Sequence, residues 1–241
     1  MMTRFIALVS GKGGVGKTSL TLALGHALAK AGKRVLLLDA NLETPNLGLH
    51  IGMMSSRKTL NHFMRKEVDL HEIVQEHKDY KFSFIPSSTS YIEFQKTNPQ
   101  DLKKVFDHLH NTYDFVLVDS PSGVGNEVYH VLKNTDEAIV IVNPTVSSVM
   151  EGLKSSELAK SHGNVLSGVV LNMTSWLARH EMKEEEVENI IGSQIIANIR
   201  HDKKFKKALH NQAPVTHLSP SSRTAKEINK IKDHLLMNFD N

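Results

Sequence analysis

The segment "VSGKGGVGKTSLTLAL" (residues 9–24) constrains the fold of this chain more than any other stretch. The overlapping run "FIALVS" before it is short and apolar and ends at a glycine, as a buried strand does. After the glycines, Leu20, Leu24, Leu28 and Ala31 recur on one helical face, and Gly32 predicts the end of that helix. A strand, a glycine-rich loop and a helix start in this order let backbone N–H groups and the helix dipole surround a phosphate.

The loop fits the pattern GxxxxGK[ST] through Gly11, Gly16, Lys17 and Thr18. In this pattern the lysine reaches the β- and γ-phosphates of a nucleotide, and the Thr18 hydroxyl binds Mg²⁺. Glycines at 13, 14 and 16 permit positive φ and a close approach of the backbone to the anion. The alternative is a glycine-rich turn without a ligand. We expect a phosphate-binding loop whose nucleotide contacts come from Gly11, Lys12, Gly13, Gly14, Val15, Gly16, Lys17, Thr18 and Ser19.

Length and composition favour one large α/β domain that spans residues 1–241, because 40% of the residues are hydrophobic and no linker divides the chain. The absence of cysteine excludes disulfides, thiolate zinc sites, cysteine-held iron–sulfur clusters and cysteine nucleophiles. The 14 histidines are scattered without metal-ligand spacing. The longest apolar runs have the length of strands, so we expect a cytoplasmic protein.

Positive charge is concentrated near the C-terminus. Residues 200–241 hold nine Lys or Arg and four Asp or Glu, a net charge of +5 in a chain whose total is +3. The cluster "RHDKKFKKALH" within this region indicates contact with non-specific DNA, an anionic membrane or the nucleotide itself. A solvated helix face is the alternative.

Further strand-like runs alternate with helical patterns along the chain. Buried strands separated by helices predict a mostly parallel sheet with right-handed crossovers and helices on both faces. Ligands of such sheets lie at the carboxyl ends of the strands. After "FIALVS", we expect strands at residues 34–40, 81–87, 114–120, 137–144, 164–172 and 193–199.

Two aspartates follow directly from this topology. Asp119 ends the strand in "VLVDSPSGVG", the usual place for a carboxylate that holds Mg²⁺ through water. Asp39 ends "VLLLDA" and supplies a second carboxylate near the metal. The loop that follows Asp39 is punctuated by Pro45 and Gly48, as a nucleotide-sensing segment would be. The alternatives are a turn-capping aspartate at Asp119 and an ordinary connection after Asp39.

The chain resembles the MinD/ParA family of deviant Walker A ATPases, and within it the MinD-like branch. The resemblance covers nearly the whole chain and rests on "GKGGVGKT", "LLLDANLETPNLGLHIG", "DFVLVDSPSG", "DEAIVIVNPTVSSV" and "MKEEEVENIIGSQIIANIRHD". It implies a single α/β P-loop NTPase domain that binds ATP and Mg²⁺. It also implies a dimer that depends on ATP and recruits or positions a protein partner.

The resemblance assigns roles to residues that the phosphate-loop pattern leaves unexplained. Lys12 matches the family's signature lysine, which crosses a face-to-face dimer and touches the phosphates bound to the partner subunit. Asn172 matches an asparagine that reads the adenine edge, with a strand-end cap as its alternative. Arg200 replaces a family proline near the base, where its guanidinium is expected to stack on adenine. Asn41 replaces the second aspartate of the family's DxD pattern, so slow hydrolysis is expected.

Two further functions stay open at this stage. One is a ParA-type protein that carries DNA on its basic C-terminal region. The other is a nucleotide-gated scaffold that hardly hydrolyses ATP. Contact with a membrane is expected to be weak, since Ala225, Ile228, Ile231 and Leu235 form a stripe that fits core packing and only "LMNFDN" follows it. Glu43 is the alternative base to Asn41.

Overall fold

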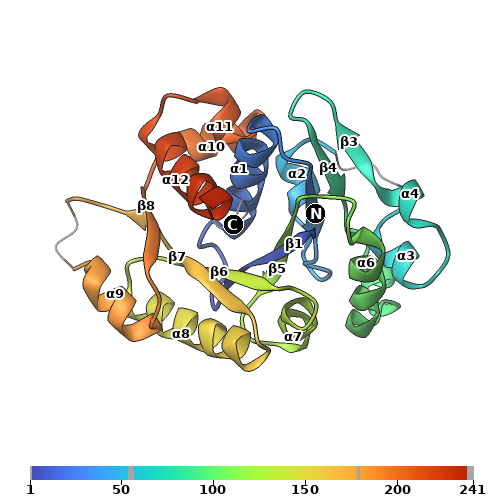
Figure 1. The fold of residues 1–241 in the computed structure, drawn as a ribbon, viewed down its shortest axis with the longest axis horizontal. Coiled ribbons are helices and arrows are strands. Elements are labelled where there is room, and N and C mark those ends of the chain that lie inside the picture. The colour runs from blue at the N-terminus through green and yellow to red at the C-terminus, as the bar shows by residue number, and fades with distance from the viewer. Residues whose placement is uncertain (1, 54–56, 178–179, 238–241) are drawn as a thin grey trace.

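An eight-stranded sheet runs through the centre of the computed structural model, which describes residues 2–53, 57–177 and 180–237 (Figure 1). The strand order is β3-β4-β2-β5-β1-β6-β7-β8. All neighbouring pairs are parallel except β3 and β4. The strands are β1 (Arg4–Ser10), β2 (Val35–Asp39), β3 (Gln75–His77), β4 (Phe82–Ile85), β5 (Phe115–Ser122), β6 (Glu137–Val142), β7 (Val165–Thr174) and β8 (Ile195–Arg200).

Seven of these strands coincide with the runs expected from the sequence, which confirms the mostly parallel α/β fold. The eighth, β3, is missing from the sequence-based expectation. It is a polar strand of three residues that pairs antiparallel with β4 at the edge of the sheet. An edge strand of this length carries no apolar alternation, so nothing in its sequence separates it from a loop.

Helices cover both faces of the sheet, as expected (Figure 1). On one face lie α1, α2, α10, α11 and α12, and on the other lie α3, α4, α6, α7, α8 and α9. The bounds are α1 (Lys17–Lys30), α2 (Leu47–His50), α3 (Leu60–Met64), α4 (Leu70–Ile73), α5 (Tyr91–Gln95), α6 (Leu102–Leu109), α7 (Asn126–Leu132), α8 (Val146–Ser161), α9 (Glu184–Ile191), α10 (Lys203–His210), α11 (Val215–Leu218) and α12 (Arg223–Met237). A short 3-10 helix at Pro99–Asp101 precedes α6, with Pro99 in its first turn.

The strands are buried on both faces because successive side chains enter two different cores. In β1, Phe5, Ala7 and Val9 belong to the core beneath α6, α7 and α8. Ile6 and Leu8 belong to the core beneath α1 and α12. This two-sided burial explains why the strands read as continuous apolar runs instead of alternating ones.

Helix α1 differs from its expected form. The sequence predicts one apolar face that includes Ala31, but residues 20–29 are buried on every side and Ala31 is exposed. The reason is that α11 and α12 pack on α1 in addition to the sheet, with α12 beside it on the same face. Gly25 permits a close approach to the sheet, since a Cβ there would lie 2.4 Å from Leu37 Cδ2. The helix ends at Lys30, and Gly32, just after the capping residue Ala31, has a φ of 84°, which fits the expected stop signal.

Helix α12 confirms the core-packing interpretation of its apolar stripe. Ala225, Ile228, Ile231 and Leu235 are fully buried in the core beneath α1. The last residues of "LMNFDN", from 238 on, lie outside the described part of the chain. Within that part, every helix is too short or too polar to span a lipid bilayer.

A cluster of rings joins α1 to α11 and to the turn between β3 and β4. His26 of α1 contacts the rings of Tyr80 and His217 edge to face. Its Nδ1 lies 2.8 Å from the Thr216 hydroxyl, which itself donates to the carbonyl of Ala23. Burial, the charge of His217 and the charge of Lys30 together lower the pKa of His26 from 6.5 to about 4. His26 is therefore neutral in the folded protein near neutral pH.

This lowered pKa predicts a pH dependence of stability. As the pH falls below 6.5, the unfolded chain protonates His26 whereas the folded protein does so only near pH 4, so folding weakens across that window. From about pH 7 to about pH 4.5, the unfolding free energy of the wild type should fall by about 2 kcal/mol more than that of His26→Gln. Urea titrations across this range measure the difference. The exposed His71, changed to Gln, is the matched control and should follow the wild type.

Candidate nucleotide-binding site

The loop between β1 and α1 has the backbone of a phosphate-binding loop. Gly14 and Gly16 have φ angles of 79° and 95°, which few other residues adopt without strain. Gly13 does not have a positive φ, so the sequence-based expectation holds for two of the three glycines. Gly11 is required for a different reason, because a Cβ there would lie 2.4 Å from backbone and side-chain atoms of Glu151 on α8.

Lys17, the first residue of α1, is 7% exposed and points toward the end of β5. Its Nζ lies 3.7 Å from Oδ1 of Asp119, which is 1% exposed. That oxygen accepts no hydrogen bond. A buried carboxylate oxygen with only a distant cation has room for a further ligand, which fits a metal ion or a water bound to it.

Asp39 lies directly opposite Asp119 in the parallel register of β2 and β5. Burial, followed by the nearby charge of Asp119, raises the pKa of Asp39 well above its usual value. Backbone N–H groups of Leu47 and Asn41 donate to its carboxylate at 3.0 Å and 3.3 Å. The two buried carboxylates and the hydroxyl of Thr18, the residue after Lys17, offer oxygen ligands of the kind that Mg²⁺ prefers. These three residues are those expected from the sequence to bind the metal.

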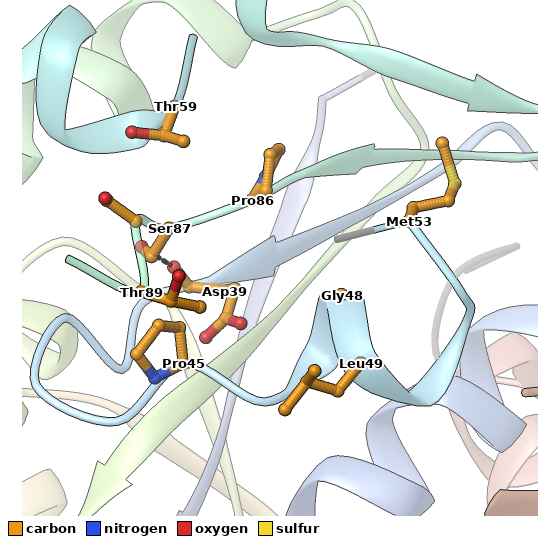
Figure 2. Close-up of a pocket in the computed structure, with 10 residues that line it drawn as sticks. Asp39, Pro45, Gly48, Leu49, Met53, Thr59, Pro86, Ser87 and Thr89 are labelled. Atoms are coloured by element: carbon orange, nitrogen blue, oxygen red, sulfur yellow. Dashed lines mark hydrogen bonds between the residues drawn. The ribbon is translucent and has the colours of Figure 1, made fainter. Parts of the chain in front are cut away.

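The segment after Asp39 folds back over the end of β4 (Figure 2). Pro45, Gly48 and Ser87 surround a small cavity of about 60 Å³ beside Asp39. The Ser87 hydroxyl donates to the Asp39 carbonyl at 2.6 Å. The expected nucleotide-sensing loop thus begins at a firmly held strand end.

Asn41 is half-buried at the start of this loop. Its Oδ1 accepts hydrogen bonds from the backbone N–H and the hydroxyl of Thr44, at 3.1 Å and 3.2 Å. In this geometry the asparagine caps a turn at the start of the loop. The side-chain oxygen that would accept a hydrogen bond from an attacking water already has two donors.

A pocket of about 110 Å³, mostly apolar, lies beside the phosphate loop and holds the expected base-binding residues. Gly16, Asn172, Met173, Arg200 and Phe205 line it. The Nδ2 of Asn172 donates to the Val15 carbonyl at 2.6 Å, so one donor of the amide supports the loop. Its remaining N–H and its Oδ1 carry the donor and the acceptor that a purine edge needs.

Lys12 does not join the buried group around Lys17. Its side chain is exposed, although the Ser10 hydroxyl anchors its carbonyl at 3.0 Å. The start of α8, which contacts Gly11, carries Val146 at 65% exposure and Met150 at 45%. The structure therefore places an exposed lysine and exposed apolar side chains on the face that bears the phosphate loop.

Three contacts of this site were not expected from the sequence. They are the hydrogen bond from Asn172 to Val15, the packing of Glu151 against Gly11, and a 3.5 Å contact between the Ser19 hydroxyl and Nδ1 of His50. Each joins residues far apart in the chain. Of these contacts, only the one at Gly11 could have been suspected from the sequence, because a glycine there permits a close approach. The sequence does not identify Glu151 as the residue that approaches.

The pair of Lys17 and Asp119 predicts a coupled effect on stability. Without nucleotide, Lys17→Met should lower the unfolding free energy by about 3 kcal/mol, because it leaves the buried Asp119 without its cation. Adding Asp119→Asn should recover most of that loss, since a neutral amide no longer needs a counter-ion. Urea denaturation of the single and double variants measures both effects. Additive losses would contradict an interaction between the two groups.

Comparisons with known proteins identify the family of this chain. Residues 3–165 match the AAA domain family. A putative septum site-determining protein MinD of Emiliania huxleyi is 34% identical, over 81% of this chain and 73% of its own length.

Two solved structures have the same fold. The septum site-determining protein MinD of Pyrococcus horikoshii, complexed with Mg-ADP, has a TM-score of 0.92 and 27% identity. The alignment covers 97% of this chain and 96% of that one. The MinC:MinD cell division complex of Aquifex aeolicus includes a chain with a TM-score of 0.86 and 26% identity, with the same two coverages. The chain described here belongs to the MinD/ParA family of P-loop ATPases.

Proposed function

We propose that this protein binds Mg-ATP, forms a face-to-face dimer around two nucleotides and uses that dimer to recruit or position a protein partner. The observation that carries the proposal is the exposed Lys12 on a loop whose other lysine, Lys17, is buried against Asp119. Lys17 contacts the nucleotide bound to its own chain. Lys12 can reach a nucleotide bound to a second copy, as an arginine finger does.

The surroundings of Lys12 support a dimer face. Val146 and Met150 are exposed close to the loop, and large exposed apolar side chains favour burial against another protein. The known MinC:MinD complex supports recruitment of a partner by this fold.

Each group of the site has a role in this proposal. Backbone N–H groups of the loop and Lys17 hold the phosphates, and the Asn172 side chain and Arg200 hold the base. Thr18, Asp39 and Asp119 would hold Mg²⁺, which neutralises phosphate charge when it is bound. These chain groups bind and orient the nucleotide, and none of them needs to move a proton.

Hydrolysis is proposed to be slow because Asn41 cannot take up a proton from water. General-base assistance contributes about 10²–10⁴-fold to a rate. Phosphoryl transfer passes through a loose transition state, which depends less on a base, so part of this factor is retained by positioning. The dimer would then persist for a long time in its ATP state.

A ParA-type function on DNA is the second candidate. The observation that favours it is α10, where Lys203, Lys204, Lys206 and Lys207 are all exposed. If these lysines bind DNA phosphates, affinity for random-sequence duplex should fall steeply as salt concentration rises. A filter-binding titration at several salt concentrations tests this candidate.

The dimer is tested first at Lys12. Lys12→Ala should bind a fluorescent ATP analogue as the wild type does but should no longer dimerise with a slowly hydrolysed triphosphate. Lys17→Ala is the contrasting variant and should lose binding itself, because it removes the cation nearest the phosphates in the same chain. Light scattering with the triphosphate and with ADP reports the dimer. A Lys12→Ala protein that still dimerises only with the triphosphate would refute the role of Lys12.

Asn41→Asp should raise single-turnover hydrolysis by roughly tenfold, the low end of the range for a general base. The new carboxylate can keep one oxygen on Thr44 and offer the other to water. Glu43→Gln is the companion variant, since Glu43 is the alternative base. Equal hydrolysis rates for the wild type and Asn41→Asp would contradict the role proposed for position 41. A large loss of rate in Glu43→Gln alone would identify Glu43 as the base.

A further inference from the structure

A second groove, of about 470 Å³, opens next to the two loops that follow Asp39 and Asp119. Its walls come from the loop after β2, from α5 with the segment after it, and from the start of α7. No residue of the phosphate loop or of the base pocket lines it. The groove is lined mainly by Glu43, Phe94, Gln95, Pro99, Pro121 and Glu127.

Two carboxylates, those of Glu43 and Glu127, line this groove. Oε2 of Glu127 is buried and has no hydrogen-bond partner in the part of the chain that the structure describes. Burial, followed by the charge of Glu43, raises the pKa of Glu127, while the N–H of Leu42 acts in the opposite direction. Among the described residues, no ion pair involves Glu43 or Glu127. A buried, unpaired carboxylate oxygen is costly, and a positively charged donor would remove that cost.

Apolar side chains surround the two carboxylates. Phe94, Pro99 and Pro121 contribute to the walls of the groove. Large exposed apolar residues stand on the same elements: Tyr91 (68% exposed) and Ile92 (61%) on α5, and Val124 (47%) just before α7. Such a combination of aromatic and aliphatic side chains around a desolvated charge is typical of an interface hot spot.

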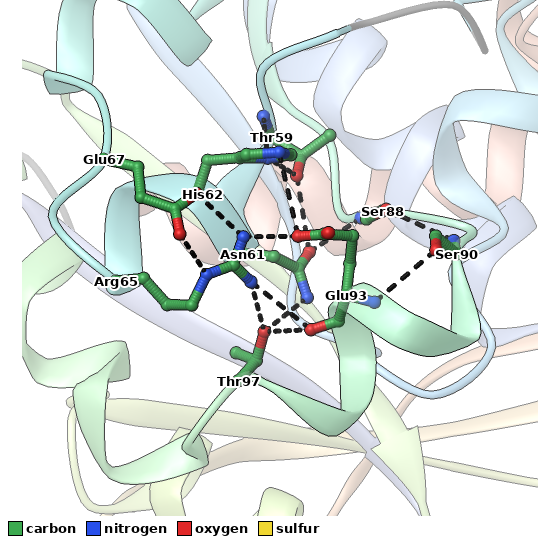
Figure 3. Close-up of polar contacts among 9 residues, drawn as sticks. All are labelled: Thr59, Asn61, His62, Arg65, Glu67, Ser88, Ser90, Glu93 and Thr97. Carbon is green, nitrogen blue, oxygen red and sulfur yellow. Dashed lines mark hydrogen bonds and ion pairs between the residues drawn. The ribbon is translucent and has the colours of Figure 1, made fainter.

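A polar network holds α5 in place before any partner binds (Figure 3). The guanidinium of Arg65, next to α3, donates to the carboxylate and the carbonyl of Glu93 on α5. Thr97 donates to the same carbonyl at 2.6 Å, and Ser90 caps the start of the helix. This wall of the groove is therefore preorganised, which lowers the entropic cost of binding.

We propose that this groove binds an arginine of another protein, carried on an otherwise apolar segment. A guanidinium has five donors in a planar fork, so it can bond Glu127 and Glu43 together, whereas an ammonium acts as a single point of charge. Its planar face also stacks on Phe94, and the apolar neighbours of the arginine would cover Tyr91, Ile92 and Val124.

The position of the groove links such a partner to the nucleotide. Glu43 follows Asn41 by two residues, and Pro121 follows Asp119 by two residues. A segment bound between them would restrain both loops at once and thereby change the rate of hydrolysis or the lifetime of the dimer. This link rests on the proposed function, whereas binding of the segment itself does not.

The test selects ligands from a random-peptide display library on the full chain, loaded with Mg²⁺ and a slowly hydrolysed ATP analogue. The selected peptides should share an arginine flanked by apolar residues. Fluorescence anisotropy should show that replacing this arginine by citrulline, its neutral isostere, weakens binding by about tenfold or more. Glu127→Gln and Glu43→Gln should weaken binding similarly, and Ile92→Ser should weaken it too.

The control variant is Glu185→Gln on α9, an exposed glutamate away from the groove, which should leave binding unchanged. Selected peptides without arginine, no selected peptides, or peptides insensitive to both glutamate variants would overturn the proposal. So would a change in the association of the chain with itself in Glu43→Gln, because the occupant would then be a second copy. ATP binding is measured on the same samples, so failure of the proposed function is recognised separately. Glu43 is exposed, so its variant serves if Glu127→Gln fails to fold.

Discussion

Three buried ionisable groups lie at the carboxyl edge of the sheet, and the surrounding structure has to offset the cost of burying them. Lys17, Asp119 and Asp39 are each less than a tenth exposed. Charges in such a place are costly unless they are paired, bound to hydrogen-bond donors or given a ligand. The parallel register of β2 and β5 brings the two aspartates face to face, and α1 starts where its lysine reaches them. The contacts within the protein thus offset only part of the cost of burying these three groups, and a bound ligand would offset more.

The loop above these charges is held from the side by distant parts of the chain. Asn172 from β7 bonds to Val15, and a Cβ at Gly16 would lie 2.4 Å from its Nδ2. On the other side Glu151 packs against Gly11. The phosphate loop therefore keeps its shape through contacts with β7 and α8, the elements that also carry the base pocket and the exposed apolar residues. The same two elements, β7 and α8, therefore shape both the phosphate loop and the exposed surface next to it.

How much of this was predictable depends on whether a feature is local. The seven apolar strands were predictable because each is buried on both faces, and Asp39 and Asp119 followed because each ends such a strand. The polar edge strand β3 gives no pattern to recognise. The groove at Glu43 and Glu127 could not be found either, because it exists only where the loop after β2 meets α5 and α7. The Asn172 contact depends in the same way on how β7 lies beside the loop.

The hydrogen bonds of Asp39 link the metal site to the loop that follows it. Its carboxylate accepts from the N–H groups of Asn41 and Leu47, while burial and then the charge of Asp119 raise its pKa. A divalent cation between the two aspartates would offset their repulsion and favour the ionised form of Asp39. An ionised carboxylate accepts stronger hydrogen bonds than a neutral one, so both bonds to the loop would strengthen. Cation binding would therefore tighten residues 41–47, the segment that carries Asn41 and the Glu43 wall of the second groove.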